Sequence, residues 1–302
     1  MSRKPLWRFV RSASQSSAAF KMSGPAASEV SIRKIAGGIG AEISGVDFSA
    51  PQPAELSSKL QQVLVEHGVV VIRGQNDLAI EDFLKLGEEF GELEDNETLD
   101  HAEGYPQVGN LIKEKGHVTS IGDMWHTDHT YLEVPARFTM LRAVELPQFG
   151  GDTLFLSAKA AFRSLPEGLK ETLRGLKALH SRSHLIKDGK YAAQFFKERP
   201  ARDGGKSNQQ MAIHPVVTTL PETGEEVLFV NPGYVVKFDG WTAKLSNGLL
   251  RDLYEHCLIP EHQFRLRWQP GTIAIWDNRQ VWHFAVNDYH GQRRAMQRLV
   301  IA

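Results

Sequence analysis

The chain has 302 residues, of which 41% are hydrophobic and 24% charged, and these proportions exclude collagen-like, intrinsically disordered and disulfide-scaffold proteins. Its 35 basic and 36 acidic residues leave a net charge of -1, which gives no electrostatic reason to expect a nucleic-acid partner. The single cysteine, Cys257, excludes an intrachain disulfide and a cysteine-rich zinc site. The longest apolar runs, such as 69–72, are too short to cross a bilayer, so no membrane partner is expected.

The first 28 residues differ in composition from the rest of the chain. They contain five basic residues, seven serines and no acidic residue, a composition found in mitochondrial transit peptides and equally in solvated tails. We expect residues 1–28 to be a disordered or targeting tail and residues 29–302 to form a single domain. The lone cysteine fits a reducing compartment, so the expected location is cytoplasmic, or mitochondrial if the tail is a transit peptide.

The beginning of the domain combines short strands with two amphipathic helices. Apolar residues recur at helical spacing before Gly68, which ends the first helix. The run that follows Gly68 is β-branched at every position as far as residue 72, a pattern typical of a buried strand. The predicted elements are strands at 31–35 and 41–43, a helix at 54–67, a strand at 69–73 and a helix at 80–90.

From residue 105 onward strand-like runs dominate. The predicted strands are 107–112, 137–144, 153–156, 227–230, 264–268, 272–276 and 299–301. Helices are predicted at 166–179 and 246–257, and the mixed connection 181–210 is of a kind that often forms a mobile lid. Many short strands without a strict β-α alternation argue against a Rossmann sheet. They predict a mainly β fold with flanking α-helices, a double-stranded β-helix or jelly roll.

The segment Trp125-His126-Thr127-Asp128-His129-Thr130-Tyr131 carries the first candidate site. If it is extended, His126 and Asp128 project from one face of a strand while His129 points away. The best candidate for a third ligand is His283, just after the predicted strand 272–276. Two histidines and one carboxylate that leave open positions on a metal form the facial triad of non-haem Fe(II) oxygenases.

Each part of this set has a common structural explanation. A single His-x-Asp pair occurs often by chance, and a single histidine near a strand end is usually a packed or surface group. The hypothesis gains weight from Arg294, Met296 and Arg298, which share one face of the predicted last strand. An arginine inside a barrel needs an anion, and a guanidinium matches a carboxylate or sulfonate. The pattern therefore predicts a carboxylate-bearing co-substrate beside the metal.

Taken together, the motifs resemble those of the taurine/2,4-D dioxygenase family of Fe(II)- and 2-oxoglutarate-dependent oxygenases. In chain order they are residues 40–47 (GAEISGVD), 125–128 (WHTD), 150–154 (GGDTL), 214–217 (HPVV), 228–231 (LFVN) and 276–279 (WDNR), followed by Arg298. The resemblance covers about residues 30–301. Six motifs in the family's order are specific, although any one of them alone is weak.

The resemblance assigns roles to six of these side chains. It implies that His126, Asp128 and His283 bind Fe(II). It further implies that Thr153 and Arg294 hold the distal carboxylate of 2-oxoglutarate, and that Arg298 faces the anionic group of the substrate. The implied activity is hydroxylation of a substrate C–H bond by O2, with 2-oxoglutarate converted to succinate and CO2. The jelly-roll fold is also part of what the family implies, and its members commonly associate, so a homo-oligomer is possible.

The residues expected around the substrate depart from those of the taurine enzyme. Asn96 and Leu99 take the places of a histidine and a tyrosine, and Gly122 replaces an asparagine. Tyr234 and Ile186 take the places of aromatic wall residues. A roomier and more apolar pocket with the Arg298 cation at one end predicts a small organic anion other than taurine. Candidates are a larger alkyl sulfonate or sulfate ester, an aryloxy- or alkyl-carboxylate, or a modified fatty acid.

Two other classes of protein are compatible with the same residues. One is a cupin-like isomerase or hydrolase that binds zinc at the triad, which would leave Thr153 and Arg294 without a task. The other is a non-catalytic barrel that binds a small molecule, which would be expected to lack a ligand or the co-substrate arginine. Neither loss is seen in this sequence, so the oxygenase is the leading hypothesis.

Overall fold

The β-branched and alternating runs of the sequence assemble into one large sheet. In the computed structural model, which describes residues 18–21, 29–53, 55–96, 99–186, 189–200 and 209–302, nine strands pair in the order β1-β2-β3-β4-β15-β7-β17-β6-β5. The pairings are antiparallel except for β3 with β4. In that order, the strands are β1 (Ala18–Lys21), β2 (Glu29–Lys34), β3 (Ala41–Ser44), β4 (Val69–Ile72), β15 (Ile273–Asp277), β7 (Phe138–Glu145), β17 (Arg294–Ile301), β6 (Tyr105–Lys113) and β5 (His101–Ala102).

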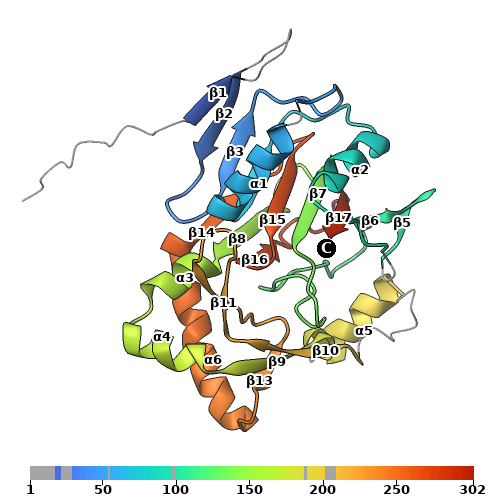
Figure 1. The fold of residues 1–302 in the computed structure, drawn as a ribbon. Coiled ribbons are helices and arrows are strands. Elements are labelled where there is room, and N and C mark those ends of the chain that lie inside the picture. Colours follow the sequence, from blue (N-terminus) through green and yellow to red (C-terminus); the bar gives the residue numbers. More distant parts are fainter. Residues whose placement is uncertain (1–17, 22–28, 54, 97–98, 187–188, 201–208) are drawn as a thin grey trace, which may run out of the picture.

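Three smaller sheets accompany the large one, and the sheet that contains β8 packs against it to complete the jelly roll (Figure 1). One is β14 (Gln263–Leu266), β8 (Thr153–Ser157) and β16 (Val281–Ala285); another is β10 (Met211–Pro215), β9 (Lys177–Ser181) and β13 (Val235–Phe238); the third is β11 (Val217–Thr219) with β12 (Glu226–Leu228). Phe155 of β8 stacks on Phe264 at 5.3 Å and meets Trp276 of β15 at 5.5 Å. These rings form the core between the layers, so the predicted mainly β jelly roll is confirmed.

Helices cover the outside of the sheets (Figure 1). Alternate residues of the large sheet, such as Ile275 and Leu299, pack under α1 (Glu55–His67) and α2 (Ile80–Glu88). A second core includes residues of α3 (Ala158–Ser164), α4 (Glu167–Arg174) and α6 (Ala243–Cys257). The remaining helical segments are η1 (Arg182–Ile186), α5 (Gly189–Glu198) and η3 (Pro260–His262). No helix of the described residues is both long and apolar enough to span a membrane.

Some predicted boundaries were wrong. The helix predicted at 166–179 ends at Arg174, because Gly175 caps it and the chain then enters strand β9. The predicted strand 227–230 stops at Leu228. Part of the connection 181–210 is helical, as η1 and α5. Residues 1–17 and 22–28 of the predicted tail lie outside the described residues, whereas Ala18–Lys21 pairs with β2 and extends the large sheet.

Candidate functional site

The two histidines of the predicted triad meet through their backbones. His126 and His283 form an isolated antiparallel bridge, in which each amide donates to the other's carbonyl at 3.1 and 2.8 Å. His283 lies in β16, directly after the turn that follows β15. Residues facing each other in such a bridge put their side chains on the same side. The ring centroids of the two histidines are accordingly 4.1 Å apart.

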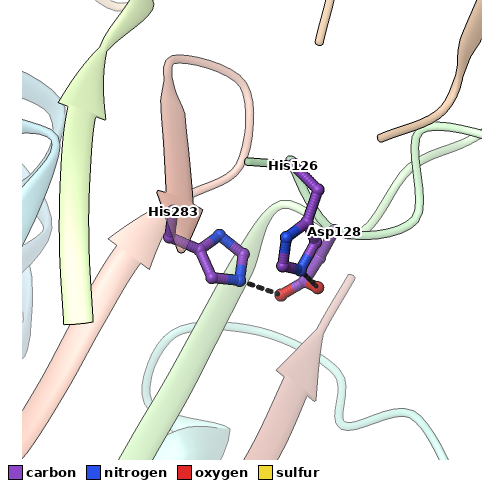
Figure 2. Close-up of side chains that lie close together, drawn as sticks. All are labelled: His126, Asp128 and His283. Atoms are coloured by element: carbon purple, nitrogen blue, oxygen red, sulfur yellow. Dashed lines mark ion pairs between the residues drawn. The ribbon is translucent and has the colours of Figure 1, made fainter. Parts of the chain in front are cut away.

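Asp128 completes a compact group of potential ligands (Figure 2). Its carboxylate oxygens lie 3.6 Å from Nε2 of His126 and 3.8 Å from Nε2 of His283. One ligand atom from each residue can be chosen so that all lie within 4.8 Å of one another. The three side chains are buried, at 4–8% exposure. Two imidazole nitrogens and a carboxylate oxygen on one side of a shared point suit a divalent transition metal.

The backbone around Asp128 is not extended, which was the condition under which the sequence placed His126 and Asp128 on one face. Only His126 takes part in a bridge, and a turn follows it in which His129 has a left-handed φ of 55°. His126 and Asp128 nevertheless converge, because the turn leaves the Asp128 carboxylate near Nε2 of His126. The Nδ1 atom of His129 lies 3.4 Å from the carboxylate of Glu94, and His129 is outside the ligand group.

Neighbouring groups prepare these side chains to bind a cation. Nδ1 of His126 donates to the Met124 carbonyl at 2.8 Å, which leaves Nε2 as an acceptor. The hydroxyl of Thr139 donates to Asp128 at 2.8 Å. Burial, followed by the proximity of His126, lowers the pKa of His283 to about 3, so its ring is neutral near pH 7. Although burial opposes ionisation, the nearby His283 and the Arg298 guanidinium hold the pKa of Asp128 well below its ordinary value.

A second feature is a buried arginine without an anion. Arg294 of β17 is 6% exposed, and its Nε and Nη2 atoms have no hydrogen-bond partner in the described part of the chain. Burial lowers the pKa of Arg294, although Tyr289 opposes this by accepting a hydrogen bond. An unpaired guanidinium in the interior is costly and calls for a carboxylate or similar ligand. The residues present therefore fit a carboxylate-bearing co-substrate.

Thr153 and Arg294 both contact the side chain of Trp268. The indole Nε1 of Trp268 donates to the Thr153 hydroxyl at 2.9 Å, and the Arg294 guanidinium is 5.9 Å from the centroid of the same indole. Thr153 starts β8 and is 3% exposed. The two side chains that the sequence analysis expected at one carboxylate therefore neighbour the same indole.

Arg298 lines a cavity together with His126 and Asp128 of the triad. Its Nη1 atom lies 4.0 Å from Asp128, Nη2 donates to Asn96 at 3.4 Å, and Nε has no partner among the described residues. Arg294, Met296 and Arg298 point to the same interior face of β17, as their spacing predicted, with Met296 only 1% exposed. Arg298 therefore places a cation beside the possible metal ligands.

The cavity beside the triad has a volume of about 390 Å³. Of the predicted substrate residues, Arg298, Leu99 and Tyr234 line the cavity. Asn96 does not line it, but accepts a hydrogen bond from Arg298. Gly122 lines it as well. The Ile186 side chain lies outside the described residues. The apolar part of the lining comes from Leu99, Ile112, Ile121, Met124, Ala192, Phe195 and Phe196.

Tyr131 and Arg182 are two of the polar cavity residues that the sequence did not predict. Arg182 of η1 donates to the Tyr131 hydroxyl at 3.3 Å, and its guanidinium lies 5.3 Å from the Tyr131 ring. Tyr131 in turn contacts Tyr234 at 4.9 Å. Burial raises the pKa of both tyrosines, so their hydroxyls stay protonated and can donate. Tyr131 follows the His-x-Asp motif, which could have pointed to it; nothing in the local sequence marks Arg182.

Comparisons with known proteins agree with this site. A family model described as "Taurine catabolism dioxygenase TauD, TfdA family" matches residues 31–300. The chain is 34% identical over 281 residues to an alpha-ketoglutarate-dependent sulfate ester dioxygenase of Pseudomonas putida, with 92% of this chain and 91% of that protein aligned. It is 32% identical over 274 residues to an alkylsulfatase of Acinetobacter baylyi, with 91% and 85% aligned.

Solved structures with a similar fold include dioxygenases of the same kind. The crystal structure of a taurine dioxygenase from Burkholderia xenovorans superposes with a TM-score of 0.74 and 27% identity, covering 90% of this chain and 89% of that one. These matches favour the oxygenase over the zinc enzyme and the non-catalytic barrel. The chain belongs to the taurine/2,4-D dioxygenase family, TauD and TfdA, and is a 2-oxoglutarate-dependent dioxygenase that uses Fe(II).

Proposed function

We propose that the enzyme oxidises an organic sulfate ester or sulfonate with an apolar chain, at the carbon next to the anionic group. The observation that carries this proposal is the Arg298 cation beside the triad, in a cavity whose mixed lining includes an apolar group formed by Leu99, Met124, Phe195, Phe196 and their neighbours. A sulfate or sulfonate head would pair with the guanidinium, and an alkyl chain would bury apolar surface. The names of the two curated relatives support the same substrate class.

The residues divide into three groups of tasks. His126, Asp128 and His283 would hold Fe(II), and Arg294 with Thr153 would hold the distal carboxylate of 2-oxoglutarate. Arg298 would orient the substrate anion, with Asn96 steadying its guanidinium and with Leu99 and Tyr234 forming the adjacent wall. When bound, iron and 2-oxoglutarate supply the activation of O2. With substrate in the cavity, the low exposure of the triad would limit the access of water to the reacting carbon.

The overall reaction balances for an alkyl sulfate. One atom of O2 enters succinate as 2-oxoglutarate loses CO2, and the other is inserted into a C–H bond of the carbon that bears the ester oxygen, where it forms a hydroxyl group. The resulting hydroxylated ester then breaks its C–O bond to sulfate, which gives an aldehyde and inorganic sulfate. Sulfate therefore leaves without any hydrolytic group of the protein, and its release should depend on 2-oxoglutarate.

A substrate panel tests this proposal. Purified enzyme with Fe(II) and 2-oxoglutarate is given alkyl sulfates, alkyl sulfonates, taurine, aryloxy-acids and fatty-acid derivatives, and both succinate formation and substrate loss are measured. We expect coupled turnover to be fastest with an apolar sulfate or sulfonate. Coupled turnover that is faster with taurine or with the carboxylates would contradict the proposal.

A binding measurement tests the metal assignment separately from turnover. Under anaerobic conditions the protein should develop a visible charge-transfer band that requires both Fe(II) and 2-oxoglutarate. Replacement of the first ligand, His126→Ala, should abolish the band, whereas the exposed control His290→Gln should leave it unchanged. A full band in His126→Ala would remove this histidine from the ligand set.

A further inference from the structure

Helix α5 forms one wall of the cavity without belonging to the hydrophobic cores. Its residues Ala192, Phe195 and Phe196 line the cavity, and the two phenylalanine rings meet edge to face at 5.5 Å. None of the described side chains of α5 is part of the three apolar cores. Another interaction must therefore fix the position of this wall.

That interaction is supplied by Glu198, the last residue of α5. Its carboxylate accepts hydrogen bonds from the amides of Val118 and Thr119 at 3.0 and 3.2 Å, and from the Thr119 hydroxyl. Gln194, one turn earlier, donates to the same carboxylate at 2.6 Å. The Glu198 side chain is only 6% exposed. Burial opposes ionisation, but these hydrogen bonds lower the pKa of Glu198 to about 2, so it is charged near neutral pH.

Arg199 adds a second set of contacts to the same segment. Its guanidinium donates to the Thr119 hydroxyl at 2.9 Å, to the Thr119 carbonyl at 3.2 Å and to Nδ1 of His117 at 3.1 Å. Its Nε donates to the Ile112 carbonyl at 3.2 Å. The same guanidinium lies 5.4 Å from the Phe195 ring and 3.3 Å from Glu198. The wall residue Phe195 is thus packed on the group that joins α5 to β6 and the segment after it.

We propose that the Glu198–Arg199 pair is a latch that fastens α5 to residues 117–119, and that through Phe195 and Phe196 it determines the length of the substrate chain. This inference rests on the proposed function, since it concerns the apolar end of the substrate whose anionic head Arg298 binds. Buried ion pairs contribute little net stability but fix geometry when every group is satisfied. Glu198 and Arg199 also border the cavity, but their polar groups are engaged with Val118, Thr119 and His117, so we assign both to positioning the wall.

The expected signature is a dependence on chain length. Each methylene buried against a fixed apolar wall should raise kcat/KM about fourfold. Loosening the wall should reduce this gain for long chains and leave chains that are too short to reach α5 nearly unaffected. A general loss of folding would instead lower activity towards all chain lengths.

The test is a series of linear alkyl sulfates assayed with Glu198→Gln and Arg199→Lys. We expect both variants to lower the ratio of long-chain to short-chain kcat/KM at least about fivefold, mostly through KM, with an unchanged band for Fe(II) and 2-oxoglutarate. Glu171→Gln, an exposed substitution on α4, is the matched control and should keep the wild-type ratio. Phe196→Ala should move the preferred length towards longer chains. Wild-type length profiles in both latch variants would overturn the proposal.

A second measurement needs no substrate. Because Glu198 accepts the amide hydrogens of Val118 and Thr119, Glu198→Gln should speed hydrogen exchange at 117–119 and in 192–199, while β16 keeps its protection. Unchanged exchange in both segments would refute the latch. If wild-type enzyme oxidises no alkyl sulfate or sulfonate, the proposed function fails, whereas the exchange result still decides whether the latch exists.

Discussion

The side chains of Arg294 and Arg298 lie on the same face of β17, but their different surroundings suit them to bind different anions. Arg298 lies 4.0 Å from Asp128 and lines the open cavity. Arg294 is enclosed, with Tyr289 and Trp268 around it and two nitrogen atoms that have no partner among the described residues. A guanidinium in such a place destabilises the protein until an anion joins it. The local environment therefore favours the co-substrate carboxylate at Arg294 and the substrate anion at Arg298.

Removing the Arg294 guanidinium should weaken 2-oxoglutarate binding without unfolding the protein. Truncating one partner of a buried charge pair costs about 2–5 kcal/mol, so Arg294→Met should raise the Kd for 2-oxoglutarate at least about thirtyfold, measured calorimetrically with Mn(II). The variant should be no less stable than wild type without 2-oxoglutarate, because it no longer buries an unpaired charge. Arg293→Lys is the control, since Arg293 faces outward and pairs with Glu114 and Glu145. Equal losses of affinity in the two variants would remove Arg294 from the binding site.

At the scale of elements, the sequence predicted a helix or strand boundary correctly where a local feature, such as a glycine followed by a change in the apolar pattern, marked it. Gly68 ends α1, and the β-branched run after it becomes β4, as predicted. Gly175 also ends a helix, but leucines at 176 and 179 continue the apolar spacing of α4, so the periodicity masked the switch to β9. The short strands β9, β10 and β13 are stabilised by pairing with one another. Such pairing joins distant residues, and a local pattern does not record it.

The junction between α1 and β4 should be sensitive to a single methyl group. Gly68 has a φ of +73°, and a Cβ there would come within 2.9 Å of Val281 in β16, two residues before His283. We expect Gly68→Ala to lower the free energy of unfolding by about 2–4 kcal/mol, from backbone strain and overpacking together, as measured by urea denaturation. Gly104→Ala has a similar φ of +80° but open space around the Cβ, so it should cost about 1 kcal/mol. Equal costs would show that the contact with Val281 is unimportant.

At the scale of the whole molecule, the triad was predictable and the substrate wall was not. His126 and Asp128 are two residues apart, and His283 follows a recognisable strand, so three positions and a family pattern were enough to bring them together. The α5 wall depends on Glu198 and Arg199 meeting residues about eighty positions earlier. Glutamate and arginine at a helix end are normally solvated side chains, and only the folded chain distinguishes this pair from the others.

The stability of the whole protein should also fall as the pH decreases, partly because of His180. This residue is fully buried, stacks on Phe229 at 5.8 Å and meets His214 edge to face at 5.1 Å. Neither of its ring nitrogens has a partner in the described residues. Burial, with a smaller effect of His214, lowers its pKa to about 3 in the folded protein. An unfolded histidine has a pKa of about 6.5, so the unfolded chain binds the extra proton between these values.

It follows that the contribution of His180 to stability is complete above about pH 7 and is lost progressively as the pH falls through 6.5 towards 3. Between pH 7 and pH 5 this single group should cost about 2 kcal/mol. Urea denaturation of the metal-free protein at both pH values measures it. His180→Phe keeps a buried ring that cannot be protonated. Its free energy of unfolding should therefore fall by about 2 kcal/mol less than that of the wild type between pH 7 and pH 5. His290→Gln, at an exposed position, should follow the wild type; if His180→Phe does so as well, the buried imidazole is not a source of the acid sensitivity.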